Sequence, residues 1–343
     1  MKKSKKPKAR KRHSIARLLY RTLVVISALV VALFIAYKIA VRPPDFSQMS
    51  NSSTSVDASA ANLADEPGGG TVMVGDKTRK EQCYTFLLAA SDDGNGNADT
   101  IMVMTYDVPN HKVGVVSIPR DTLIHRSSGM PKINAAYAKG IENLQAVVSD
   151  LVGYPIDYYV CVNIKGFQAI VDAVGGVDFY VPCNMSYDDP TQDLTIHFKE
   201  GMTHLDGREA MEVARFRKNN DGSGYSDIGR TETQQKLLQT VAKKVMSYSS
   251  ITKMSKFLNI FSSYVDTDLS PSNMTYFATK GMSLSLSEDV STATLPGDGN
   301  TTYRGYNYCY ELSPDESLQI LNQMVNPFTT DLTLDDTDIF QVK

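Results

Sequence analysis

The densest set of chemically capable side chains in this chain is an arginine-rich segment beyond its midpoint. Arg215 and Arg217 stand two residues apart, and Asp227, Arg230 and Gln234 follow shortly after. Arginine carries a planar fork of N–H donors that fits phosphate oxygens two at a time. On an extended backbone, residues two apart project to the same face. This spacing predicts a site for a doubly charged anion or a pyrophosphate.

An acidic loop lies earlier in the chain, between two apolar segments. It contains Asp92, Asp93 and Asp99 among glycine and asparagine residues. A Mg²⁺ ion is usually held by one or two carboxylates together with substrate phosphates. The loop therefore predicts a divalent cation, Mg²⁺ or Mn²⁺, and an ordinary polar turn is the alternative interpretation.

Two further segments add cationic side chains. Arg120 and Asp121 follow an apolar run, and Lys132 precedes a predicted helix. Both segments could contribute to the anion site. The alternatives are a surface Arg–Asp pair, which would contribute little to stability, and plain helix capping at Lys132. Asp227 could likewise cap the helix that follows it.

The apolar periodicity predicts mixed strands and helices to position these residues. Strands are expected over 84–90, 100–107, 112–118, 158–163, 177–181 and 194–198 and near 306–312. Helices are expected over 135–151, 165–174, 231–246 and near 314–324, and 207–217 is expected to start as a helix and end extended. The mixture indicates an α/β or α+β fold in layers. Most apolar residues of the helices 135–151 and 231–246 are expected to be ordinary core.

Charge is distributed unevenly along the 343 residues. The first 42 residues hold 12 of the 35 Lys and Arg residues and none of the 38 acidic ones. The remainder therefore carries 23 basic against 38 acidic side chains, a net charge of −15. The overall net charge of −3 hides this contrast between a basic start and an acidic bulk.

A membrane anchor explains the contrast. Residues 22–41 form an apolar run of 20 residues, roughly 30 Å of helix, which spans a bilayer core. The basic residues 1–21 place the N-terminus in the cytoplasm, so a linker over 42–80 and a domain over 81–343 would lie outside the cell. A cleaved signal peptide, a buried core helix and a nucleic-acid-binding tail are the alternatives; the run lacks an A-x-A cleavage site and is apolar on all sides.

Four cysteines, Cys83, Cys161, Cys183 and Cys309, would face an oxidising environment outside the cell. Three pairings are possible. A bridge between Cys183 and Cys309 is expected, and Cys161 is expected to be a buried thiol. No C-x-x-C spacing suggests a zinc site.

Taken together, these segments resemble the LytR–CpsA–Psr family of bacterial cell-envelope phosphotransferases. The matching strings are Asp99-Thr-Ile-Met102, Ser117-Ile-Pro-Arg-Asp-Thr122, Lys132-Ile-Asn-Ala-Ala-Tyr137, Gly175-Gly-Val-Asp178, Leu205-Asp-Gly207, Arg215-Phe-Arg217, Asp227-Ile-Gly-Arg230 and Gln234-Gln235. They follow the family's order over roughly residues 84–247, leaving 248–343 to complete the domain. Asn97, Thr233 and Ala90 depart from the family's pattern, which predicts weaker pyrophosphate binding.

The resemblance implies an α-β-α sandwich around a mixed sheet, with an apolar pocket for a polyprenyl tail. It implies transfer of a glycopolymer, such as teichoic acid or capsular polysaccharide, from an undecaprenyl-pyrophosphate carrier to the 6-hydroxyl of N-acetylmuramic acid in peptidoglycan. By family motif, Asp92 and Asp99 would hold Mg²⁺. The pyrophosphate would contact Arg120, Lys132, Arg215, Arg217 and Gln234, and Asp227 and Arg230 would line the same catalytic site.

Two other functions fit part of the pattern. Water in place of the sugar would make the protein a polyprenyl-pyrophosphate hydrolase that uses the same residues. A non-catalytic, envelope-related transcriptional attenuator is the third candidate. The short basic tail has few apolar residues with which to build a DNA-reading core, so no nucleic-acid partner is expected.

Overall fold

The computed structural model describes residues 43–44, 73–91, 96–191, 194–224, 227–246, 251–285 and 287–342. The predicted tail 1–21, the predicted membrane helix 22–41, most of the linker and Asp92 lie outside these residues. Within the described ranges, no helix combines the length and the apolar character needed to cross a bilayer.

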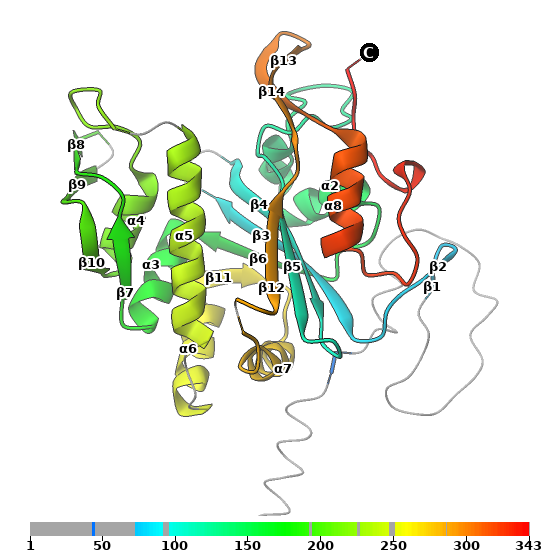
Figure 1. Cartoon of the computed structure of the whole chain (residues 1–343), viewed down its shortest axis with the longest axis horizontal. Helices are drawn as coiled ribbons and strands as arrows, with labels where there is room; N and C mark the ends of the chain where they lie inside the picture. Colours follow the sequence, from blue (N-terminus) through cyan, green and yellow to red (C-terminus); the bar gives the residue numbers. More distant parts are fainter. Residues whose placement is uncertain are drawn as a thin grey trace, which may run out of the picture.

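A mixed six-stranded sheet forms the centre of the described structure (Figure 1). Its strands are β3 (Cys83–Ser91), β4 (Ala98–Asp107), β5 (Lys112–Ser117), β6 (Tyr158–Asn163), β11 (Val265–Thr267) and β12 (Val290–Thr294). They lie in the order β11-β6-β3-β4-β5-β12. Strands β3, β4 and β5 are antiparallel neighbours, whereas β6 runs parallel to β3 and β12 parallel to β5. The strands predicted over 84–90, 100–107, 112–118 and 158–163 are confirmed.

Helices cover both faces of the sheet. Successive side chains of a strand point to opposite sides, and here both sides carry apolar residues that need to be buried. The helices are α2 (Ile141–Val152), α3 (Ile164–Ala173), α4 (Gly207–Arg215), α5 (Asp227–Met246), α6 (Ile251–Tyr264), α7 (Pro271–Gly281) and α8 (Pro314–Met324), with short 3-10 helices η2 (Ile133–Lys139) and η3 (Leu334–Asp336). Leu87 belongs to the core formed with α2 and α8, and the adjacent Phe86 packs on the other face with Tyr276 of α7. The predicted mixed α/β fold around a central sheet is confirmed.

A second core lies beside the sheet and carries the arginine-rich segment. Helices α3, α4, α5 and α6 enclose it with β7 (Val177–Val181), β8 (Met185–Asp189), β9 (Leu194–Phe198) and β10 (Gly201–Leu205). Strand β7 pairs with β10 and β8 with β9, both antiparallel. Strands β8 and β10 were not predicted, because Asp, Ser, Gly and Thr residues give them little apolar alternation.

Two helices differ from the prediction at their ends. The helix predicted over 135–151 is interrupted at Gly140, whose φ of 105° only glycine adopts readily. Helix α5 begins at Asp227, so Asp227 is its first residue and does not precede it as a cap. The helix predicted over 314–324 is confirmed as α8.

The folded region begins before the predicted boundary at residue 81. Strands β1 (Met73–Val74) and β2 (Lys77–Thr78) form a small hairpin, and the amide of Lys80 donates to the carbonyl of Pro327 at 2.8 Å. Arg79 is buried and its guanidinium pairs with the carboxylate of Asp157. Residues 73–80, which the composition assigns to the linker, are therefore part of the domain.

The expected disulfide is wrong: all four cysteines are free thiols. Cys183 packs at the edge of the second core. Cys309 is buried on β14 (Tyr306–Leu312), where its thiol lies 3.3 Å from the carbonyl of Tyr306. Burial raises the pKa of Cys161, which is confirmed as a buried thiol. The even number of cysteines carried no information on where the fold places them.

Candidate active site

A network of four charged side chains lies where β5 ends and β4 begins. Arg120 donates from Nη1 to Oδ1 of Asp99 at 2.7 Å, and its Nε lies 3.5 Å from Oδ2 of Asp121. Lys132 reaches Oδ1 of Asp121 at 3.0 Å. The antiparallel pairing of β4 with β5 explains the contact, since Ser117 lies opposite Met102 and brings the two strand ends together. The structure thus unites three predicted site residues: Asp99, Arg120 and Lys132.

Charges within this network stabilise one another. Partial burial alone would lower the pKa of Arg120, but the hydrogen bond to Asp99 and the charge of Asp121 outweigh it and raise that pKa above its ordinary value. Arg120 therefore remains a full cation at any physiological pH. Half of the Asp99 side chain is exposed, so an anion or a cation from solvent can reach this pair.

The arginine-rich segment is positioned by the end of α4. Phe216 follows the helix in an extended conformation, with φ of −61° and ψ of 133°, and its ring is buried in the second core. This anchor leaves Arg215 half-buried on the last turn and Arg217 exposed on the extended chain. The prediction that 207–217 starts helical and ends extended is confirmed.

A capping box starts the same helix. The carboxylate of Asp206 accepts from the amide of Glu209 at 2.8 Å, and Glu209 accepts from the amide of Asp206 at 2.9 Å. At the other end, Gln234 of α5 donates from Nε2 to the carbonyl of Ala214 at 2.9 Å. Gln234, predicted to contact pyrophosphate, thus joins α5 to the turn that carries Arg215.

The remaining predicted residues are placed only by their backbone or not at all. Asp227 and Arg230 lie in the first turn of α5, and their side chains are outside the described part of the chain. Asp92 is also outside it, so the predicted metal pair of Asp92 and Asp99 remains a prediction. Among the described residues, no group of three or more His, Cys, Asp and Glu side chains could hold a metal ion.

A hollow of about 650 Å³ opens at the carboxyl ends of the parallel strands β3 and β6. Ligands commonly bind at this edge of α/β sheets. Ser91, which precedes the acidic loop, and Gly96 within that loop line the hollow together with Tyr137, Lys165 and Asp266. The hydroxyl of Ser91 lies 3.3 Å from that of Tyr137, a contact that would lower the tyrosine pKa, but burial and the neighbouring groups raise it. Lys165 and Asp266 gave no signal in the sequence, because each stands alone among ordinary residues.

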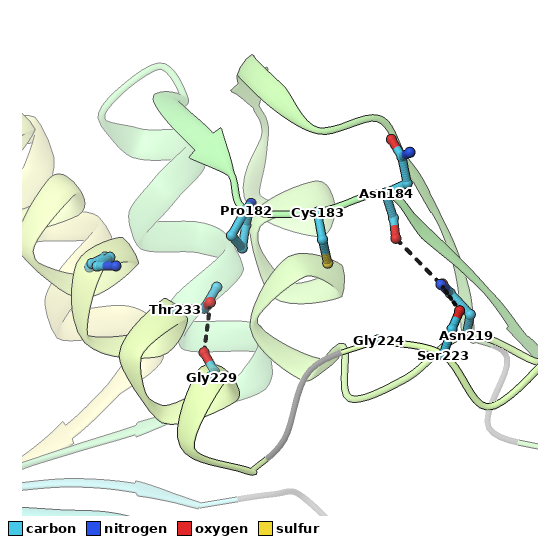
Figure 2. Close-up of a pocket in the computed structure, with 9 residues that line it drawn as sticks. Pro182, Cys183, Asn184, Asn219, Ser223, Gly224, Gly229 and Thr233 are labelled. Atoms are coloured by element: carbon cyan, nitrogen blue, oxygen red, sulfur yellow. Dashed lines mark hydrogen bonds between the residues drawn. The ribbon is translucent and has the colours of Figure 1, made fainter.

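A second hollow, of about 460 Å³, separates α5 from the segment between β7 and β8 (Figure 2). Cys183 and Asn219 line one side, and Thr233 of α5 lines the other, its hydroxyl donating to the carbonyl of Gly229 at 2.9 Å. Asn219 donates from its amide to the hydroxyl of Ser223 at 3.0 Å. Neither hollow is an apolar tunnel.

The described apolar residues of the two predicted lipid-lining helices lie mainly in the cores. Leu144, Val148 and Leu151 of α2 belong to the main core, and Leu237 and Val241 of α5 belong to the second. The interpretation of these residues as core is confirmed.

Comparison with known proteins gives the family. Residues 46–326 match the LytR_cpsA_psr family. The chain belongs to this family. The match includes every segment that carries a predicted site residue, from the acidic loop to α5.

Relatives of this chain include named teichoic acid transferases. The chain is 38% identical over 256 residues to a polyisoprenyl-teichoic acid–peptidoglycan teichoic acid transferase, TagU, of Bacillus anthracis, covering 72% of this chain and 80% of the relative. It is 32% identical over 251 residues to the corresponding transferase TagV of Bacillus subtilis, covering 69% and 62%. The crystal structure of B. subtilis TagV superposes with a TM-score of 0.61 at 27% identity, covering 70% of this chain and 95% of that one.

Proposed function

We propose that this protein transfers a teichoic acid or a related glycopolymer from a polyprenyl-pyrophosphate carrier to peptidoglycan. The observation that carries the proposal is the Asp99–Arg120–Asp121–Lys132 network, built from family segments in a chain 38% identical to a teichoic acid transferase. The acceptor is the 6-hydroxyl of N-acetylmuramic acid, and the product is a phosphodiester.

In this reaction the acceptor oxygen bonds to the phosphorus that carries the polymer. The bond from this phosphorus to the bridging oxygen breaks, and polyprenyl phosphate leaves with the electron pair. The acceptor proton passes to a carboxylate, Asp227 or one in the acidic loop. Charge spreads over the phosphoryl oxygens in the transition state, and Arg120, Arg215 and Arg217 supply donors that stabilise it.

Asp99 has a defined role in the state that the structure describes. Its carboxylate oxygen accepts from the Arg120 guanidinium at 2.7 Å, in the manner of a phosphate oxygen. An arriving pyrophosphate would take over this donor and leave Asp99 available to a cation. Mg²⁺ prefers carboxylate oxygen ligands, and Asp99 is half-exposed, so Asp99 fits the role predicted for it. Mg²⁺ bound there, with Asp92 as the second predicted ligand, would neutralise phosphate charge.

The proposed location follows from the substrates. A carrier lipid and peptidoglycan meet at the outer surface of the cell membrane, and the basic residues 1–21 followed by the apolar run 22–41 would anchor the domain there with its N-terminus in the cytoplasm. Protease added to intact spheroplasts should digest the domain and leave a short protected fragment. Full protection of the domain would contradict this orientation.

The test of the function is transfer by the full-length chain in detergent micelles. A short-prenyl pyrophosphate disaccharide serves as donor and a peptidoglycan oligomer as acceptor. Arg215→Ala is expected to lower the rate roughly 100-fold or more, the usual cost of losing a donor to a developing oxyanion. Arg208→Ala is the matched control, because Arg208 lies on the same helix with 70% of its side chain exposed and, among the described residues, forms its ion pair with Glu212 of that helix.

The products separate the candidate functions. Disaccharide phosphate attached to the oligomer supports the transferase. Free disaccharide phosphate without attachment would identify a hydrolase. Equal rates for Arg215→Ala and the native chain would overturn both.

A further inference from the structure

One tyrosine stands out in the C-terminal hairpin beside the charged network. The hairpin consists of β13 (Gly297–Tyr303) and β14 and rises above the sheet (Figure 1). Tyr308 on β14 is 74% exposed, the largest exposure among the large hydrophobic side chains of the described residues. Its φ of 55° lies in the left-handed region, which is unfavourable for a bulky residue.

A bulge in the hairpin produces this conformation. Thr301 lies opposite Cys309, and Tyr303 lies opposite Tyr306. Between these two pairs β13 moves on by two residues and β14 by three, so β14 contains one extra residue. Such a bulge re-aims a side chain and is frequent beside active sites. The turn at Arg304 and Gly305 has positive φ at both positions, as a two-residue type I′ hairpin turn requires. Tyr308 lies outside that turn, so turn geometry does not account for it.

Lys132 holds the bulge in place. Its Nζ donates to the carbonyl of Asn307 at 3.1 Å, to the carbonyl of Tyr308 at 3.0 Å and to Asp121 at 3.0 Å. An ammonium group has three donors, so protein oxygens engage all of them. Lys132, predicted to contact pyrophosphate, acts in this state as a positioning residue for the hairpin.

The hairpin is also hydrogen-bonded to the segment that carries Arg120. Tyr310 donates its amide to the carbonyl of Asp121 at 2.8 Å and accepts from the amide of Leu123 at 2.8 Å. Asp121 in turn faces both Arg120 and Lys132. These bonds connect the backbone of Tyr308 to the segment that carries Arg120, which pairs with Asp99.

We propose that Tyr308 is a carbohydrate-stacking residue that binds a pyranose ring next to the reacting phosphate. Tyr308 carries an exposed aromatic ring on a backbone that is hydrogen-bonded to the segment of Arg120, the arginine proposed to bind phosphate. Such a ring matches the apolar face of a sugar whose neighbouring group is an anion. The inference rests on the proposed function, since a sugar lies on each side of that reaction. The pyranose belongs either to the donor polymer or to the acceptor glycan, and the experiment below distinguishes these two sources.

The experiment measures equilibrium binding to the full-length chain by calorimetry. One probe is a lipid-free N-acetylglucosamine–N-acetylmuramic acid oligomer, and the other is a short-prenyl pyrophosphate disaccharide. Tyr308→Asn removes the ring and suits a left-handed residue, whereas Tyr308→Phe keeps the ring. Tyr180→Ala is the control, because Tyr180 is 53% exposed on the distant strand β7.

Tyr308→Asn should bind one probe about tenfold more weakly, while Tyr308→Phe and Tyr180→Ala stay within about twofold. The affected probe identifies the source of the sugar. The thermal midpoint of Tyr308→Asn should equal or exceed that of the native chain, because strain is relieved, so weaker binding cannot be ascribed to unfolding.

Unchanged affinity of Tyr308→Asn for both probes overturns the proposal, and so does absence of native binding to both. These measurements need no turnover. Native binding without transfer would contradict the proposed function alone. An Arg215→Ala loss of transfer together with full binding by Tyr308→Asn would contradict the stacking role alone.

Discussion

A buried ion pair joins the first folded residues to the central sheet. Arg79 donates from Nη1 to Oδ1 of Asp157 at 2.7 Å and from Nη2 to Oδ2. The Asp157 carboxylate also accepts from the amide of Thr85 at 2.7 Å and from its hydroxyl at 2.9 Å. Only 1% of the Asp157 side chain is exposed. Removing Arg79 would leave a buried carboxylate with hydrogen bonds but without its counter-charge.

Arg79→Met should therefore lower the free energy of unfolding at neutral pH by about 3–5 kcal/mol, the usual cost of breaking a buried pair. Burial raises the pKa of Asp157, and Arg79 and Thr85 oppose that rise. Without Arg79 the pKa rises further above its unfolded value. A carboxyl with a raised folded pKa costs stability when it is ionised, so the loss in the variant should shrink as the pH falls and Asp157 takes up a proton.

Urea unfolding of the full-length chain in micelles, followed by circular dichroism across a pH series, measures the change. Arg79→Met combined with Asp157→Leu should recover most of the loss, since replacing both charges by apolar groups is often neutral. Lys112→Met is the control: Lys112 pairs with Asp289 at the surface, and its loss should cost less than about 1 kcal/mol. A loss below about 1 kcal/mol for Arg79→Met, or a loss that does not vary with pH, would refute the reasoning.

Three further outcomes are expected. Asp206→Ala removes the capping box of the arginine-bearing helix and should cost about 1 kcal/mol in urea unfolding, whereas Asp206→Asn should cost less. Gly114→Ala should destabilise the chain by more than about 3 kcal/mol in the same assay, because a Cβ would lie 1.8 Å from the carbonyl oxygen of Met324, whose backbone has to move; a smaller loss would show that α8 shifts freely. Asp99→Asn removes one of the two negative charges that Arg120 faces and leaves Asp121. Inorganic pyrophosphate should therefore bind the variant several times more tightly without Mg²⁺ and lose any gain from added Mg²⁺. Calorimetry with and without the metal checks both, and weaker metal-free binding would contradict the role given to Asp99.

The sequence predicted the elements whose signals are local. Strands such as 112–118 and the helix 314–324 carry strong periodicity, and the structure confirms them. The extended turn after Arg215 was also predictable, because two arginines around one phenylalanine favour a buried ring between two polar side chains. The helix break at Gly140 could not be predicted, because it depends on one backbone angle and glycine also occurs inside helices.

Pairings between distant segments lay beyond the sequence. Arg79 and Asp157 are 78 residues apart, and nothing local marks either as a partner. The same holds for the hairpin, where Tyr310 pairs with the segment after Arg120 across almost 190 residues. Composition assigned residues 73–80 to a linker because their partners, such as Pro327, come from the other end of the chain.

These long-range contacts change how the candidate site is understood. Family motifs supply the charges, but the three N–H donors of Lys132 bond to Asp121 and to two hairpin carbonyls. Lys132 therefore affects a ligand indirectly, by positioning Tyr308 and Arg120. Gln234 likewise acts on Arg215 through the carbonyl of Ala214. A substitution at either residue would then disturb the geometry of its neighbours as well as the charge. The effect of a Lys132 substitution on the rate should therefore depend on whether Tyr308 keeps its position. The effect of a Gln234 substitution should depend in the same way on Arg215. Contacts among the motif residues alone would not reveal this dependence.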